Sequence, residues 1–165
     1  NGGFDTHYPA PSVEDQEFSF RLARQGHRLV FVSNAIVCHR HDLNLLEYIQ
    51  RKFWIGYWKI FLLRRHPAKA IQDSHTPLSQ RAQILLMGAF LFFAVFGFIV
   101  PTLWFAAFAA LAIFFVSMIP FLIFIAQHDP ALLIATPFFI VVRALALGAG
   151  LFIGFLMAFL KRADV

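Results

Sequence analysis

Three carboxylates near the start of the chain have the residue types needed for acid–base chemistry. Glu14, Asp15 and Glu17 fall within four residues, shortly after a glycine pair, Gly2 and Gly3, that permits a tight backbone path with positive φ. Asp15 or Glu14, in the first turn of a helix beside such a loop, could act as a general base on an acceptor hydroxyl. Acids in a first turn also stabilise the helix dipole by about 0.3–1 kcal/mol each. Position alone leaves both interpretations open.

Two histidines form a second candidate group. His39 and His41 follow two short apolar runs, residues 29–32 and 35–38, which are rich in β-branched side chains. These runs predict two extended segments with a bend between them. Residues two apart in an extended chain point to the same side, so both imidazoles could face one site. The alternative is a pair of surface or hydrogen-bonded histidines, because no partner stands at metal-ligand spacing.

Local signals predict the elements that position these groups. Residues 1–12 form a loop, and a helix is predicted over 13–25, with Ser12 as its N-cap and Gly26 as the residue that ends it. A second helix is predicted over 43–65, where aromatic residues recur at helical spacing among Arg and Lys. Such a helix suits the lipid interface, with its rings at head-group depth. An ordinary domain-packing helix is the alternative.

The composition places the protein in the membrane class and argues against nucleic-acid binding. The chain is 59% hydrophobic, with 22 Phe among its 165 residues, which is far from the soluble norm. Residues 82–128 contain no Asp, Glu, Lys or Arg, and the net charge of +5 arises largely beside aromatic residues ahead of that stretch. Anionic lipid head groups would attract such residues. The single cysteine, Cys38, excludes an internal disulfide.

The second half of the chain predicts membrane-spanning helices. The apolar runs 84–100 and 103–126 are separated by a very short, uncharged turn. A span needs about 20 residues, so the two runs predict a transmembrane hairpin. The apolar segment 131–160 is too long for one straight span, and Pro137 and Arg143 interrupt it. An interfacial or re-entrant tail is therefore expected there, with a third span as the alternative.

A series of motifs occupies residues 1–66. In chain order it comprises Gly2-Gly3-Phe4-Asp5, then Glu14-Asp15-Gln16-Glu17-Phe18 with Arg21-Leu22 and Gly26, then Ala35-Ile36-Val37-Cys38-His39. In order and spacing, the series resembles the C-terminal half of the catalytic domain of family 2 glycosyltransferases. The resemblance implies an α/β fold, the C-terminal fragment of a GT-A-like nucleotide-sugar transferase domain, followed by α-helical transmembrane segments.

The same resemblance implies a reaction and the residues that perform it. Asp15 matches the family's catalytic base, which deprotonates the acceptor hydroxyl as it attacks the anomeric carbon. Asp5 and Glu14 match positions near the acceptor, together with Gly3 of the turn. The implied activity is inverting transfer of a sugar from a nucleotide-sugar donor to a lipid-linked or saccharide acceptor. Synthesis of a cell-envelope polysaccharide is the implied setting.

The resemblance also implies a metal, and the sequence departs from the family in two respects. His39 matches a histidine that helps to hold Mg²⁺ or Mn²⁺ on the diphosphate, with His41 as a second candidate. The family's Asp-x-Asp motif would lie upstream of Asn1, so the chain is expected to be the C-terminal part of a longer protein and inactive alone. Residues 50–54 resemble the Gln-x-x-Arg-Trp motif of processive synthases, but Phe53 takes the place of the arginine, so non-processive transfer is expected.

Four segments are therefore predicted. They are 1–42, the end of the catalytic domain; 43–81, an interfacial helix and linker; 82–127, a two-helix transmembrane hairpin; and 128–165, an interfacial, re-entrant or third transmembrane segment. The expected location is the cell membrane, as a multi-pass protein with its catalytic part in the cytosol and membrane lipids around it. The alternative is a non-enzymatic small membrane subunit, a transport or assembly component.

Overall fold

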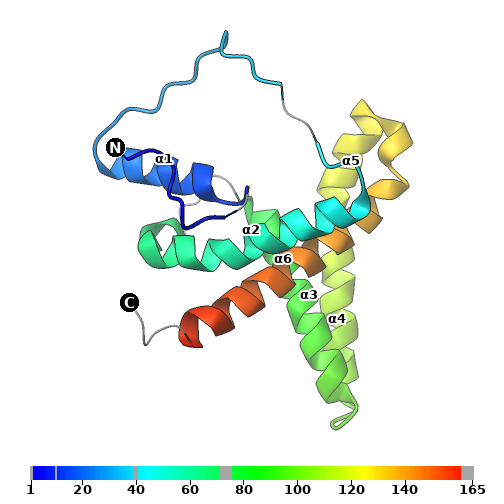
Figure 1. The fold of residues 1–165 in the computed structure, drawn as a ribbon. Helices are drawn as coiled ribbons and strands as arrows, with labels where there is room; N and C mark the ends of the chain where they lie inside the picture. Colours follow the sequence, from blue (N-terminus) through cyan, green and yellow to red (C-terminus); the bar gives the residue numbers. More distant parts are fainter. Residues whose placement is uncertain (1, 10, 39–40, 71–75, 161–165) are drawn as a thin grey trace. The chain divides into compact units, whose positions relative to one another are not determined.

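The described part of the protein is built from helices alone. The computed structural model describes residues 1–165 except 1, 10, 39–40, 71–75 and 161–165. It is 72% helix and has no strand or sheet among these residues, so the predicted α/β fold is wrong for them (Figure 1). The elements are α1 Glu14–Arg24, α2 Leu45–Arg65, η1 Pro67–Ala70, α3 Leu78–Gly97, α4 Leu103–Val116, α5 Ile119–His128, η2 Pro130–Leu132 and α6 Ala135–Leu160.

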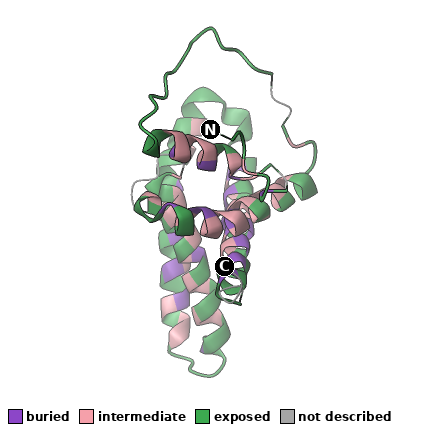
Figure 2. Cartoon of the chain, turned by 60° about the vertical axis from the view of Figure 1, so that its left-hand side comes forward, coloured by how far each residue is buried: buried purple, intermediate pink, exposed green. Residues whose placement is uncertain are grey.

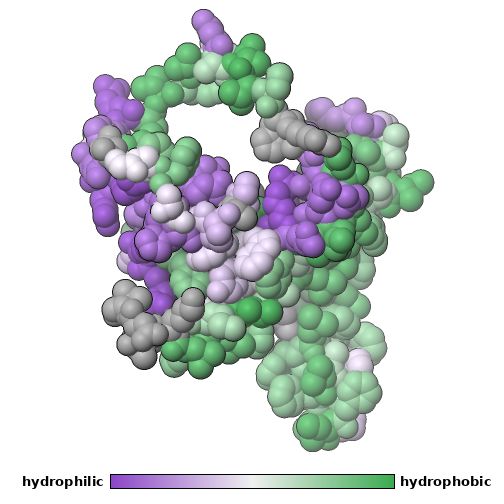
Figure 3. Space-filling model, viewed as in Figure 1, coloured by the Kyte–Doolittle hydropathy of each residue, from purple (hydrophilic) through white to green (hydrophobic). Residues whose placement is uncertain are grey.

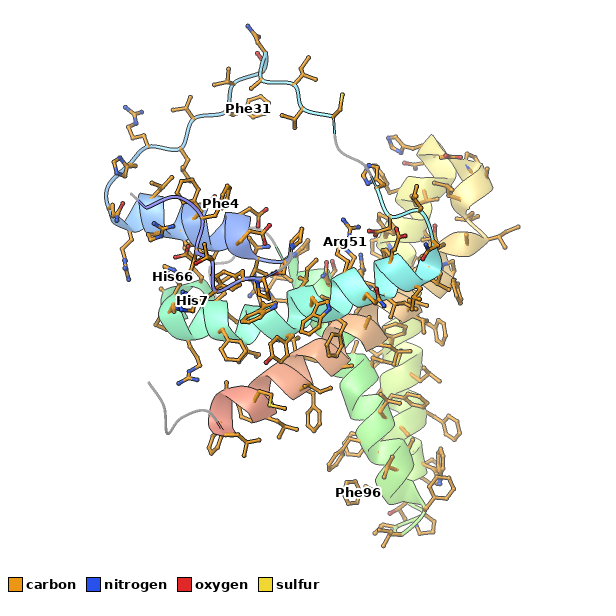
Figure 4. All side chains as sticks on the ribbon, viewed as in Figure 1. Phe4, His7, Phe31, Arg51, His66 and Phe96 are labelled. Atoms are coloured by element: carbon orange, nitrogen blue, oxygen red, sulfur yellow. The ribbon has the colours of Figure 1, made fainter. Side chains whose placement is uncertain are left out.

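The two apolar runs expected to be extended form an exposed arm instead of strands. We call residues 29–38 the apolar arm; a turn at Ser33 and Asn34 divides it, as predicted. The side chains of Val30 and Phe31 are 75% and 91% exposed, and Figure 4 shows Phe31 projecting from the arm. A strand forms only when a second backbone satisfies its N–H and C=O groups. No described segment pairs with the arm in a sheet, so β-branched composition alone does not produce one.

The first helix begins and ends close to the predicted residues. It spans Glu14–Arg24, one residue shorter at each end than expected. Ser12 does not cap it with its side chain; its backbone amide instead donates to the Glu14 carboxylate at 2.6 Å. Gly26 has φ +83°, and the two amides after the helix bond back to carbonyls of its last turn. This is the Schellman arrangement, so the prediction that Gly26 ends the helix is confirmed.

The chain divides into two compact units, residues 1–75 with 150–165, and residues 76–149. In the first unit, α1 and the loop before it pack on α2. The core of this contact consists of Tyr8, Val13, Phe20 and Leu62, with Ile55 and Trp58 packed against it. The indole of Trp58 meets the Tyr8 ring edge-on, with centroids 5.4 Å apart, which is a favourable aromatic geometry.

The opposite face of α2 packs closely on the end of α6. A Cβ atom added at Gly154 would lie 2.5 Å from the carbonyl oxygen of Tyr57, and one at Gly150 would meet the backbone of Phe53 still more closely. Ala158 continues this row of small residues at every fourth position and is buried. Small residues at this spacing let two helix backbones touch.

The second unit contains a hairpin of α3 and α4 together with α5 and the first part of α6. Its core consists of Met87, Phe114, Met118, Ile140 and Ala144. A short break separates α4 from α5, and Pro120 stands in the first turn of α5. In the burial colouring of Figure 2, buried residues follow these helices among largely exposed ones.

Three stretches of helix are long and apolar enough to cross a membrane. They are Leu78–Gly97, Leu103–His128 and Ala135–Leu160, and Figure 3 shows hydrophobic side chains covering α3 and α4. These stretches indicate a membrane protein. The last one is a single helix, although Pro137 and Arg143 were expected to interrupt it. Pro137 lies in the first turn, where a missing N–H costs no helical bond.

Candidate functional site

The three acids of α1 have different surroundings. Glu17 is only 4% exposed; its carboxylate accepts from Arg21 at 3.2 Å and lies 3.8 Å from Nε2 of His66. Glu14 is half-buried and accepts the Ser12 amide. Asp15 is exposed, and its Oδ1 accepts the neighbouring amide of Gln16 at 2.7 Å. Of the three, Asp15 is the most exposed to solvent.

The glycine turn is fixed against α1. Gly2 and Gly3 have φ values of +72° and +70°, the left-handed conformation that the glycine pair predicted. The guanidinium of Arg21 donates to the carbonyl oxygen of Gly3 and lies over the ring of Phe18, 5.3 Å from its centroid. The turn is thus held by the same arginine that pairs with Glu17.

Asp5 anchors the loop to the end of α2. Its carboxylate accepts Nδ1 of His7 at 2.7 Å and forms an ion pair with Arg65. Burial would raise the pKa of Asp5, but the hydrogen bonds from His7 and Arg65 outweigh it and lower the pKa to about 2. The same pairing raises the pKa of Arg65. Both groups are therefore charged at neutral pH, and the acceptor-binding role of Asp5 stays a prediction.

His66 is a site residue that sequence reasoning missed. It follows α2 directly, is buried, and its ring meets Phe20 edge-on at 5.8 Å. Burial lowers the pKa of His66, although the nearby Glu17 carboxylate opposes this. A single histidine between two helices carries no periodic or motif signal, so only the packing of α2 on α1 brings it to Glu17.

The predicted metal ligands are not assembled by the described residues. His39 lies outside them, and His41 is exposed on the coil before α2. Next to it, Asp42 pairs with Arg51 at 2.6 Å. Within the described part of the chain, no group of three or more His, Cys, Asp or Glu side chains could hold a metal ion. These residues therefore do not fit a complete metal site, and we derive no step through a metal.

The second unit contains a separate polar group among apolar helices. Gln83 of α3 is 3% exposed; its Oε1 accepts Nη2 of Arg143 from α6 at 2.8 Å. Its Nε2 donates over 3.5 Å to the carbonyl oxygen of Ser117, where α4 ends. We call these three residues the polar tie. It gives the arginine charge a buried polar partner and links three helices within the unit.

Comparison with known protein families, with curated proteins and with solved structures finds no match to this chain. The resemblance to family 2 glycosyltransferases therefore rests on the motifs of residues 1–66 alone.

Proposed function

We propose that the protein takes part in the inverting transfer of a sugar from a nucleotide-sugar donor to an acceptor hydroxyl at a membrane surface. Asp15 accepts the proton of that hydroxyl while its oxygen attacks the anomeric carbon, and the nucleoside diphosphate leaves from the opposite face. Transfer is non-processive and occurs on the cytosolic side of the cell membrane. The divalent cation that such a reaction uses, Mg²⁺ or Mn²⁺, stays part of the proposal.

The exposure of Asp15 is the observation that carries this proposal. Asp5 and Glu17 are engaged with cationic side chains, and Glu14 binds the backbone of Ser12. Asp15 also accepts a backbone amide, that of Gln16, but it is the exposed residue among these four acids and lies in the first turn of a helix that packs on α2. A general base must be reachable by the proton that it abstracts and must be held in place. Asp15 combines these two properties.

The layering of the first unit supports a location at the membrane surface. With 100° per residue in a helix, Ile55, Trp58 and Leu62 of α2 face one direction, toward α1. Phe53 and Tyr57, which meet α6, face nearly the opposite one. The outer side of that part of α6 is apolar, with Phe152, Phe155 and Phe159 exposed. Within the unit, the charged helix α1 packs on one side of α2, and the apolar end of α6 packs on the other. This polarity is what a structure at a membrane interface would have.

The rival function, a non-enzymatic membrane subunit, gains support from one observation. The described residues hold only helices and no sheet, whereas a nucleotide-sugar site of the implied kind needs strands. A subunit of this kind would hold the polar tie and the apolar helices for assembly alone. The two proposals differ in whether the exposed carboxylate of Asp15 has a chemical task.

Sugar transfer by the gene product in its native membranes distinguishes them. We expect Asp15→Asn to lower turnover of nucleotide sugars by about 10²–10⁴-fold, because general-base catalysis contributes that much. Asp129→Asn, which removes the same charge from another exposed position, should leave turnover unchanged. Membrane levels of all proteins are compared by immunoblot. Equal turnover by wild type and Asp15→Asn would remove Asp15 from the chemistry, and no turnover by wild type would favour the rival.

A further inference from the structure

A groove runs between the end of α2 and the end of α6 within the first unit. Its lining consists of Ile60, Arg64, Phe155, Ala158 and Phe159; we call it the α2–α6 groove. Four of these side chains are apolar, and the guanidinium of Arg64 is the charged group among them. Arg64 Nη1 donates to the carbonyl oxygen of Ala158 at 3.0 Å. This bond holds the cation against the last turns of α6.

The arginine keeps binding capacity beyond that one contact. A guanidinium carries five N–H donors in a planar fork that matches phosphate oxygens. The neighbouring Arg65 is neutralised by Asp5, whereas Arg64 bonds to a neutral carbonyl. The groove therefore presents a positive charge together with an apolar surface. Soluble anions would satisfy the charge but leave the apolar lining in contact with water.

The aromatic walls indicate the second half of the ligand. Phe155 and Phe159 are 54% and 63% exposed, on a helix that is apolar enough to enter a membrane. Two large rings one helical turn apart form an apolar patch that a hydrocarbon chain would cover. A cation beside apolar side chains matches a phosphate group attached to acyl chains.

We propose that the α2–α6 groove binds one anionic glycerophospholipid. Its phosphate is held by Arg64, and an acyl chain lies against Phe155, Phe159 and Ile60. The bound lipid completes the contact between α2 and the end of α6, so it is a structural ligand of the first unit. This site is independent of Asp15, and it does not require that the protein transfers sugars.

Lipid retention tests the site directly. The full chain is purified in mild detergent from vesicles containing equal amounts of phosphatidylglycerol and phosphatidylcholine, and the retained lipids are counted by native mass spectrometry. We expect wild type to retain phosphatidylglycerol preferentially. Arg64→Gln should lower this preference about tenfold, because charge-assisted hydrogen bonds to phosphate are lost. Arg28→Gln removes the same charge from an exposed position outside the groove and should leave the preference intact.

A second variant separates the lipid site from the bond between Arg64 and Ala158. Phe159→Ala keeps the charge and that bond but removes an apolar wall, so it should also reduce the number of lipids retained. Circular dichroism confirms that each variant keeps its helices. The proposal is overturned if wild type shows no preference for phosphatidylglycerol, if Arg64→Gln and Arg28→Gln reduce it equally, or if Phe159→Ala retains as much lipid as wild type.

Discussion

Replacing Gly154 by alanine should separate α2 from the end of α6. The added Cβ would stand 2.5 Å from the carbonyl oxygen of Tyr57 and 3.1 Å from its carbonyl carbon and Cα. All three neighbours are backbone atoms, so no side chain can rotate away. Ordinary contact begins near 3.4 Å, and the two helices must therefore move apart by about 0.9 Å at this point, since a close-packed contact does not otherwise yield.

The cost follows from two opposing terms. Forcing an extra methyl group into a close-packed contact costs about 1–3 kcal/mol. Alanine in place of a mid-helix glycine regains about 1 kcal/mol of helix propensity. The net change should destabilise the first unit by about 0–2 kcal/mol. A leucine at the same position would exceed this range, because its side chain would also have to pass between the helices.

Gly88→Ala provides the matched control. Gly88 lies in the middle of α3, and nothing stands within 4 Å of a Cβ atom added there. This substitution regains helix propensity without a clash, so it should be neutral or stabilising. Unfolding by SDS in mixed micelles, followed by circular dichroism, measures both variants. A Gly154→Ala protein as stable as Gly88→Ala would refute the close contact between α2 and α6.

Two further predictions concern the polar tie and the loop anchor. Gln83→Leu should destabilise the second unit by about 1–3 kcal/mol, because Arg143 is left without this partner; the double variant with Arg143→Leu should recover most of the loss in the same SDS titration. Asp5 has a folded pKa near 2, against its usual 3.8, so its ion pair stabilises above about pH 4 and this contribution disappears as the pH falls toward 2. Asp5→Asn should remove that pH dependence, which fluorescence of Trp58, beside Tyr8, can follow. An unchanged acid transition in Asp5→Asn would contradict the anchoring role.

The helices and their ends were the most predictable part of the fold. The stop at Gly26 and the helix over residues 43–65, found as Leu45–Arg65, were read from local chemistry. Asn44 begins α2 by accepting the Glu47 amide, and the Glu47 carboxylate accepts the Leu43 amide in return. Such caps involve residues at most four apart, so a sequence contains all the information that they need.

The α/β prediction failed because a sheet is not a local property. The apolar arm has the β-branched composition of strands, but pairing requires a second backbone of suitable register. The described residues offer none, and the arm's side chains are left exposed. The order of the motifs supported the family resemblance, and the prediction of a sheet came from that resemblance. Neither the periodicity nor the composition of the sequence required a sheet.

The sequence predicted which residue types form the candidate site, but not which side chains they bind. The carboxylates and the glycine turn were found from spacing, and the catalytic role of Asp15 stays a prediction. The anchors are non-local: Arg65 lies 60 positions from Asp5, and Lys59 lies 43 positions from its partner Gln16. Pairs at that separation leave no pattern in one sequence. The packing of α2 against α1 creates them.

The polar tie accounts for a charge that the sequence placed in an apolar helix. From Gln83 to the end of α3 at Gly97 the helix extends about 21 Å, at 1.5 Å per residue. The hydrocarbon core of a bilayer is about 30 Å thick. If α3 ends at one boundary of the core, the tie and Arg143 lie roughly 9 Å from the other. A charge at that depth costs less than one at the centre of the core, and the bond to Gln83 gives it a polar partner. With that placement, α6 carries the charge as one unbroken helix.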